Sequence, residues 1–199
     1  GNSDRGVHHD NIFFIKNLNE TLEKSHPDVM RIAEDSSDYP KVTHPVSEGG
    51  LGFDYKWDMG WMNDTLRYFK VDSYNRRDYQ GNITFSMYYF PNERFLLPLS
   101  HDEVVHLKKS MVDKMAGSYE DKFKQLKVLM AYQMTHPGKF LNFMGNEIAT
   151  FEEWNENVGI RWEYLDYPIH RDYHNFIKYL NKLYLDEKAF YKYDYEDQG

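Results

Sequence analysis

Acidic side chains follow three segments of this chain that are expected to be strands. They lie within four residues of the ends of the runs 29–33, 94–99 and 140–144: Glu34 with Asp35, Asp102 with Glu103, and Glu147. In a parallel β/α protein the carboxyl ends of the strands meet at one face, so these acids are expected to lie together. Two carboxyl groups facing each other across a sugar are the minimum for glycosidic chemistry: one is held protonated as a general acid, and the other stabilises or captures the oxocarbenium-like centre. A single acid at a strand end more often caps a helix, but three in the same position favour a site.

Two histidines flank the second acidic pair, in His101-Asp102-Glu103-Val104-Val105-His106. A helical zinc pair places His at i and i+4, on one face of the helix. Here the spacing is five residues, a rotation of about 500°, which turns the rings ~140° apart. The spacing therefore argues against a zinc hydrolase, and no metal site is expected. His101 suits a histidine that donates to a sugar hydroxyl, and an ordinary structural histidine fits equally well.

Three tryptophans, Trp57, Trp61 and Trp154, could stack on sugar rings, although tryptophan more often belongs to the core. Trp154 lies in a polar stretch just after an expected strand and is the best platform of the three. The sequence contains neither a phosphate-binding loop nor a dinucleotide fingerprint nor a Gly-x-Ser-x-Gly elbow. The aromatic residues decide little by themselves, because rings that line carbohydrate clefts also fill cores.

The composition of the chain excludes several classes of binding partner and of functional site. The 199 residues include 24 Lys and Arg against 32 Asp and Glu, a net charge of −8, which disfavours binding to nucleic acid or to an anionic membrane. Cysteine is absent, which excludes disulfides, a thiolate nucleophile and cysteine-bound metals. No apolar run approaches the ~18 residues of a membrane span. A cytoplasmic location is consistent with these features.

The hydrophobic pattern predicts an α/β fold with a parallel sheet. The expected strands are 29–33, 53–59, 94–99 and 140–144. The expected helices are 11–24, 61–69, 121–135 and 171–185, with 83–90 either helix or strand. Two details are specific: 29–33 reads as a buried strand, and the first helix should bury the face that holds Phe14, Ile15, Leu18 and Leu22. Four units make half of an eight-fold barrel, since a whole one needs ~250 residues, and a small open sheet is the alternative.

Five sequence blocks resemble the 1,4-α-glucan (glycogen or starch) branching enzymes of glycoside hydrolase family 13. They are 33–40 (AEDSSDYP), 49–64 (GGLGFDYKWDMGWMND), 97–106 (LPLSHDEVVH), 143–147 (FMGNE) and 153–155 (EWN). The likeness runs from about Asn11 to the end of the chain. The second block is highly specific, whereas the third is partly shared with the wider amylase superfamily.

The resemblance implies a partial (β/α)8 TIM barrel and a retaining transglycosylase. Such an enzyme cuts an α-1,4 bond of a glucan and passes the released segment to a 6-hydroxyl, which forms an α-1,6 branch. It implies that Glu34 is the general acid/base, that Asp102 stabilises the transition state, and that His101 binds sugar hydroxyls. With Trp57 and Trp154 as platforms, the expected partner is an α-glucan such as glycogen, amylose or starch. The family needs no cofactor.

One departure from the family concerns the nucleophile. The family's nucleophilic aspartate lies in an Arg-x-Asp-Ala-Val setting on the strand before the acid, and neither Asp4 nor Asp10 has that setting. With Gly1 in place of an initial Met, residues 1–199 are expected to be the second half of the catalytic barrel. The first half, the N-terminal modules and the C-terminal β domain would then lie outside this chain. The chain alone is expected to be inactive, because a retaining mechanism needs its nucleophile.

Three further expectations concern association and rival functions. A half barrel exposes two sheet edges, near Val29 and Phe140, and bare edges invite pairing between two copies. An amylase-like or trehalose-forming enzyme of the same superfamily is one rival, and product analysis would distinguish it. A non-catalytic glucan-binding piece is another, and it would keep its binding after Glu34→Gln.

Overall fold

Four short strands form one parallel sheet in chain order in the computed structural model, which describes residues 6–195. They are β1 (Ile32–Ala33), β2 (Tyr55–Trp57), β3 (Phe95–Leu99) and β4 (Lys139–Asn142). The register places Ala33 beside Lys56, Trp57 beside Leu96, and Leu99 beside Asn142. The predicted parallel α/β architecture is confirmed, and β1 and β4 are the two edges of this sheet.

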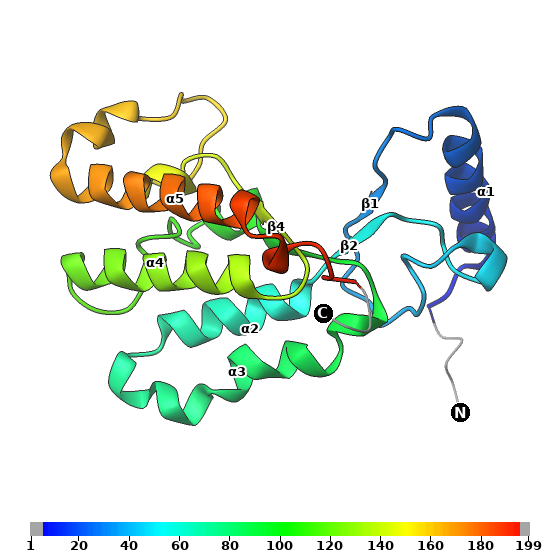
Figure 1. Ribbon diagram of the computed structural model, residues 1–199, viewed down its shortest axis with the longest axis horizontal. Coiled ribbons are helices and arrows are strands. Elements are labelled where there is room, and N and C mark those ends of the chain that lie inside the picture. Colours follow the sequence, from blue (N-terminus) through cyan, green and yellow to red (C-terminus); the bar gives the residue numbers. More distant parts are fainter. Residues whose placement is uncertain (1–5, 196–199) are drawn as a thin grey trace.

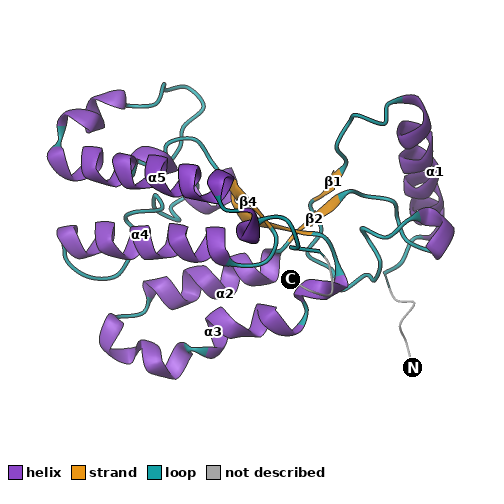
Figure 2. Ribbon diagram, viewed as in Figure 1, coloured by secondary structure: helices purple, strands orange, loops and turns teal. Residues whose placement is uncertain are grey.

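The helices lie on two sides of the strands (Figures 1 and 2). The α-helices are α1 (His9–Ser25), α2 (Met59–Lys70), α3 (Gly81–Thr84), α4 (Tyr119–Thr135) and α5 (Pro168–Asp186). The 3-10 helices are η1 (Val46–Glu48), η2 (Ser73–Tyr79), η3 (Phe85–Tyr88), η4 (Phe90–Asn92), η5 (His101–Val104), η6 (Asn146–Ile148), η7 (Trp162–Asp166) and η8 (Lys188–Phe190). Figure 1 shows α2 to α5 stacked together, while α1 stands apart beyond β1 and β2. Segment 83–90, left open by the sequence, is helical. Within the described residues, no helix is both long and apolar enough to cross a membrane.

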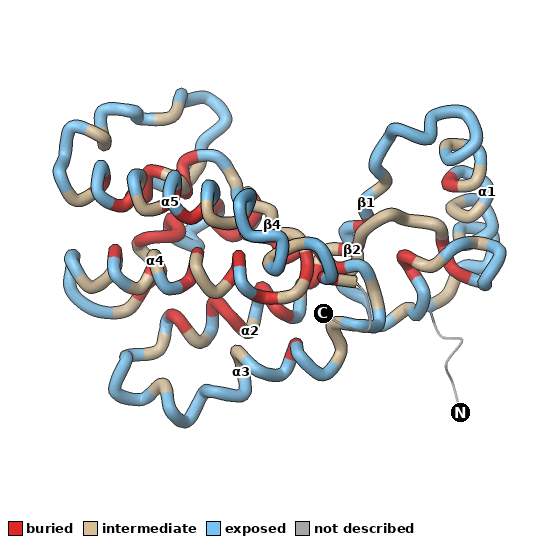
Figure 3. The backbone as a smooth tube through the Cα atoms, in the orientation of Figure 1, coloured by how far each residue is buried: buried red, intermediate tan, exposed pale blue. Residues whose placement is uncertain are grey.

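The main core lies between β3 and helices α2, α4 and α5. All five residues of β3 are buried, as expected for a central parallel strand covered on both faces. Leu97 and Leu99 pack there with the inner face of α4, whose buried apolar residues are those that the spacing predicts: Phe123, Leu126, Leu129, Met130 and Met134. Figure 3 shows buried backbone concentrated in this part of the molecule.

The predicted inner face of α1 is wrong for Phe14 and Leu18, whereas Ile15 packs inward. Phe14 is 63% exposed and Leu18 is 42% exposed, and the buried residue of this helix is Asn19. The helix is rotated so that Ile12 and Ile15 pack against a small cluster of Ala33, Val42 and Leu51. The Asn19 amide donates to the Leu51 carbonyl at 2.8 Å, so a polar contact sets the orientation that the apolar pattern could not indicate.

The segment 29–33 is also less buried than predicted. Its strand covers only Ile32–Ala33, and Val29, Met30 and Ile32 are 52%, 61% and 40% exposed. The reason is topological, because β1 is an edge strand that pairs only with β2 among the described residues. The strand predicted over 53–59 is likewise short, since Asp58 already caps α2.

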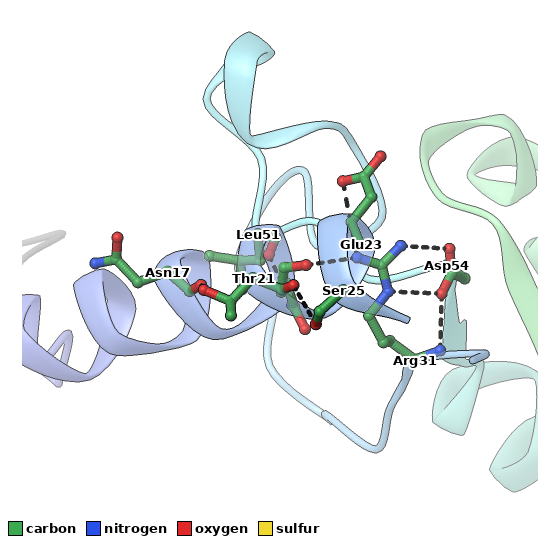
Figure 4. A network of polar contacts seen from close by, with 8 residues as sticks. Asn17, Thr21, Glu23, Ser25, Arg31, Leu51 and Asp54 are labelled. Atoms are coloured by element: carbon green, nitrogen blue, oxygen red, sulfur yellow. Dashed lines mark hydrogen bonds and ion pairs between the residues drawn. The ribbon is translucent and has the colours of Figure 1, made fainter. Parts of the chain in front are cut away.

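A charged network fastens β1 to its neighbours (Figure 4). The Arg31 guanidinium donates to both carboxylate oxygens of Asp54 at 2.9 Å and to the Asn19 carbonyl at 2.7 Å. Partial burial tends to raise the pKa of Asp54, but hydrogen bonds from Arg31 outweigh it and leave the pKa below its usual value. A bidentate pair of this kind fixes geometry as well as charge. It joins α1, β1 and the start of β2 into one unit.

Candidate active site

Glu34 and Asp102 both lie beyond the carboxyl ends of parallel strands. Glu34 is exposed and directly follows β1, while Asp102 lies in η5 after β3 with its side chain 46% exposed. One strand, β2, separates them, so β1 and β3 lie about 10 Å apart. In register, Glu34 continues the row of Trp57 and Leu96, and Asp102 follows six residues after Leu96. The two acids therefore both lie at the end of the sheet where the strands finish. Asp102 lies farther along in the strand direction than Glu34.

Asp102 and Glu103, the acidic pair after β3, have different roles because Glu103 takes part in a capping box. The Ser100 hydroxyl accepts from the Asp102 N–H at 3.3 Å, and Glu103 accepts from the N–H and the hydroxyl of Ser100 at 2.6 and 2.7 Å. This reciprocal pattern begins a helical turn and satisfies its free donors. Glu103 is buried and structural, so the carboxylate available for a ligand is that of Asp102.

Two aromatic rings lie next to His101 at the carboxyl end of β3. Its ring centroid lies 5.9 Å from Phe143 and 6.3 Å from Trp154, and these two rings meet edge to face at 5.2 Å. The Trp154 N–H donates to the Val104 carbonyl at 2.9 Å, which holds the 153–155 block against η5. His101 Nε2 lies 3.6 Å from Asp102 Oδ1. The structure thus brings together two of the predicted substrate-binding residues, His101 and Trp154, with Asp102.

The loop after η5 is held by two charged side chains that sequence reasoning missed. Lys114, which is buried, donates to the carbonyls of Glu103, Lys108 and Lys109. Glu153 accepts from the N–H groups of Leu107 at 3.0 Å and Lys109 at 2.6 Å. His106, Leu107 and Lys109 all have positive φ, which costs energy for residues other than glycine. No sequence pattern signals this clamp, because its partners are backbone atoms.

The three tryptophans fall into different environments. Trp61 is 1% exposed and stacks on Tyr132 at 6.0 Å, so it belongs to the core and offers no sugar platform. Trp57 is half-buried and lines a cavity of about 560 Å³ that also includes Asp35, Lys56 and Asp58. Trp154 lines a separate cavity of about 300 Å³ beside Arg161 and Val158. Neither Glu34 nor Asp102 lines either cavity.

The other acids of the sequence pattern are engaged locally. Partial burial tends to raise the pKa of Asp35, but hydrogen bonds from Ser37 and then from Lys56 outweigh it and lower the pKa. Lys56 is buried and also donates to the Ser37 carbonyl at 2.8 Å. Glu147 accepts from the Gly145 N–H at 2.7 Å. Among the described residues, no three His, Cys, Asp or Glu side chains are arranged to hold a metal ion.

Solved structures share this architecture at low sequence identity. A cyclomaltodextrinase aligns over 95% of this chain and 30% of its own, with a TM-score of 0.61 and 15% identity. The α-amylase from Geobacillus thermoleovorans aligns over 95% of this chain and 40% of its own, with a TM-score of 0.57 and 16% identity. At this identity the likeness concerns the fold alone, and the fold is a partial (β/α)8 barrel.

Curated sequences are far more similar. The 1,4-alpha-glucan branching enzyme GlgB of Halothermothrix orenii is 50% identical over 188 residues, which are 94% of this chain and 30% of that protein. That of Desulfitobacterium hafniense is 52% identical over 91% of this chain and 29% of its own length. No family model matches the chain. The chain thus spans about 30% of the length of these relatives. Over the segment it shares with them, this chain is about half identical to proteins named 1,4-alpha-glucan branching enzymes.

Proposed function

We propose that this chain contributes the acid/base and the transition-state-stabilising carboxylate of an α-glucan branching site. In this proposal Glu34 protonates the leaving glucosyl oxygen and Asp102 stabilises the oxocarbenium-like centre. His101 binds sugar hydroxyls, and Trp57 and Trp154 offer ring faces to neighbouring glucosyl units. The acceptor is a glucan 6-hydroxyl, so the product is an α-1,6 branch.

The observation that carries the proposal is that Glu34 and Asp102 both follow the carboxyl ends of parallel strands. Barrel enzymes place their catalytic groups at the carboxyl ends of strands. The His101–Phe143–Trp154 cluster beside Asp102 supports a sugar-binding role for this end of the sheet. About 50% identity to proteins named branching enzymes supports transfer over hydrolysis.

A chimera tests this function directly. The 188-residue segment of the Halothermothrix orenii enzyme that aligns with this chain is replaced by this chain, and branching of amylose is measured as new α-1,6 linkages. We expect Glu34→Gln to lower the rate by about 10²–10⁴-fold, because it removes the general acid. We expect Asp102→Asn to lower it by about 10²–10³-fold through lost charge stabilisation. Asp28→Asn, an exposed acid six residues from Glu34 and outside the cavity that Trp57 lines, is the matched control and should keep the rate.

The same assay distinguishes the alternatives. Branching leaves the number of reducing ends nearly constant, whereas an amylase-like hydrolase multiplies it. The 199-residue chain by itself is expected to give no transfer, because the Arg-x-Asp-Ala-Val setting of the nucleophile does not occur in its sequence. The non-catalytic glucan-binding alternative would be favoured by two results together. The branching rate of the chimera would be unchanged by Glu34→Gln and Asp102→Asn, and the chain would still bind maltooligosaccharide.

The proposal extends to the setting of the chain. We propose that residues 1–199 form the second half of a catalytic barrel, act in the cytoplasm, and serve glycogen or starch synthesis. The resemblance to branching enzymes is what supports these three points. Self-association of two copies through β1 and β4 is also proposed, because both are edge strands of the described sheet.

A further inference from the structure

A large cavity lies between the end of α2 and the loop 103–117, and its lining is strongly basic. Its volume is about 910 Å³. Six cationic residues line it: Arg67, Lys70, Lys108, Lys109, Lys114 and Lys122. Two acids, Glu103 and Asp113, also line it, which leaves an excess of four positive charges in a chain whose net charge is −8. We call this space the basic cavity.

The acids in the lining are already engaged by other groups. The Glu103 carboxylate accepts from the N–H and hydroxyl of Ser100, and the Asp113 carboxylate pairs with Lys122 at 2.9 Å. Arg67 lies 4.0 Å from Asp64 and is otherwise exposed, as is Lys70. Both lie in the last turn of α2, where the helix dipole favours cations, but that preference does not account for the other four.

Lys114 carries one of these positive charges in a buried position. Its side chain is 6% exposed and its ammonium contacts backbone carbonyls. Burial, and after it the charge of Lys70, lowers the pKa of Lys114 to about 8. The carboxylates of Glu103 and Glu153 offset only part of this effect, so the lining keeps its excess of positive charge. The cavity is therefore built in a way that an anionic ligand would stabilise.

We propose that the basic cavity binds a phosphate monoester. Such a group carries roughly two negative charges near neutral pH and several acceptor oxygens, which match a ring of ammonium and guanidinium donors. The volume is far larger than one ion needs and lies within the range of about 300–1,000 Å³ typical of small-molecule sites. Met62, Leu66 and Met115 provide an apolar wall for the organic part of the ester. Neither Glu34 nor Asp102 lines the cavity, but Lys108, which does, donates to the Asp102 carbonyl at 2.9 Å.

Titration of the ¹⁵N-labelled chain with glucose 6-phosphate tests this site. We expect saturable amide shifts concentrated in residues 103–117, weaker shifts with inorganic phosphate, and none there with glucose. The double variant Arg67→Gln/Lys70→Gln should weaken glucose 6-phosphate binding by about tenfold or more, since two cations face the ligand. Both residues are exposed, so the fold should be kept, which the spectrum of the variant verifies.

The matched control is Lys24→Gln/Lys178→Gln, which removes two exposed lysines outside the cavity and changes the net charge equally. It should bind glucose 6-phosphate like the original chain. Equal weakening by both double variants would overturn the proposal, because it would show a general charge effect. Glucose binding as tightly as glucose 6-phosphate would also overturn it, as would an absence of saturable shifts in 103–117.

Discussion

At the scale of single residues, the two acids of each adjacent pair, Glu34 with Asp35 and Asp102 with Glu103, differ in burial and in hydrogen bonding. Glu103 completes a capping box and is buried, whereas Asp102, one position earlier, keeps an exposed carboxylate beside His101. Asp35 is held by Ser37 and Lys56, whereas Glu34 beside it is exposed. In each pair one acid stabilises the strand end and the other remains available for chemistry.

The sequence identified these positions but not this division of roles. Spacing after an apolar run indicates a strand end, and it does not say which of two adjacent carboxyl groups turns inward. The tryptophans show the same limit, because Trp61 and Trp154 differ in burial through packing against distant elements: Tyr132 for the former and η5 for the latter. Only the assembled sheet supplies those neighbours.

A buried acid at the start of α2 gives a prediction about pH and stability. Asp58 is 3% exposed; its Oδ1 accepts from the Trp61 N–H at 2.7 Å and the Tyr89 hydroxyl at 3.0 Å, and its Oδ2 has no hydrogen-bond partner. Burial raises the pKa of Asp58 more than these bonds lower it. The unfolded pKa is about 3.9, so folding favours the protonated acid. The protonated Asp58 contributes fully to the stability of the fold below about pH 3.9, the unfolded pKa. This contribution is lost as the pH rises through the pKa of Asp58 in the folded chain.

Replacement of Asp58 tests that linkage. Asp58→Asn keeps the accepting oxygen and removes the buried charge, so the variant should gain stability relative to the original chain as the pH rises above about 4. Asp58→Ala is the matched control, because it also removes the cap and should cost about 1 kcal/mol. Urea unfolding at several pH values measures both. A free-energy difference between the Asn variant and the original chain that does not change with pH would contradict the assignment.

At the scale of elements, the best predictions came from strongly periodic segments with a covered face. The inner face of α4 was predicted correctly because β3 and α5 lie against it. The inner face of α1 was wrong in part because that helix packs against only a few apolar residues, and the polar contact from Asn19 and the pair of Arg31 with Asp54 set its position. Hydrophobic periodicity predicts orientation only where enough apolar surface is buried.

The loop 106–109 depends on Glu153 in a way that can be measured. Its carboxylate holds two N–H groups of a segment with three positive φ angles. Glu153→Gln leaves one acceptor oxygen and adds a donor, and the loss of a hydrogen bond to a charged group costs about 1.5–3 kcal/mol. We therefore expect the amides of Leu107 and Lys109 to exchange hydrogen about 10–100 times faster, because about 1.4 kcal/mol corresponds to tenfold.

Glu156→Gln provides the control for that exchange experiment. It removes an exposed carboxylate three residues away and should leave both amides unchanged. Hydrogen exchange followed by NMR resolves the two positions from the rest of the chain. Unaltered exchange at Leu107 and Lys109 in Glu153→Gln would mean that the loop is held by Lys114 alone.

At the scale of the whole molecule, the open edges of the sheet are the main consequence of having four strands. Val29, Met30 and Ile32 expose apolar surface at the β1 edge. Two copies that pair their edges would cover part of this surface, so sedimentation velocity should show a dimer whose fraction rises with concentration. Ile32→Lys should reduce the dimer, since a charge on an edge strand opposes pairing. The exposed Leu185→Lys, on α5, is the control. A single monomeric boundary at the highest concentrations would contradict self-association.

The account as a whole depends on Glu34 and Asp102 acting on one sugar. The most direct test is a crystal structure of this chain with a bound maltooligosaccharide. The account predicts one glucosyl unit between the two carboxyl groups, with His101 on its hydroxyls. An oligosaccharide that contacts neither Glu34 nor Asp102, or carboxyl groups on opposite faces of the sheet, would contradict it.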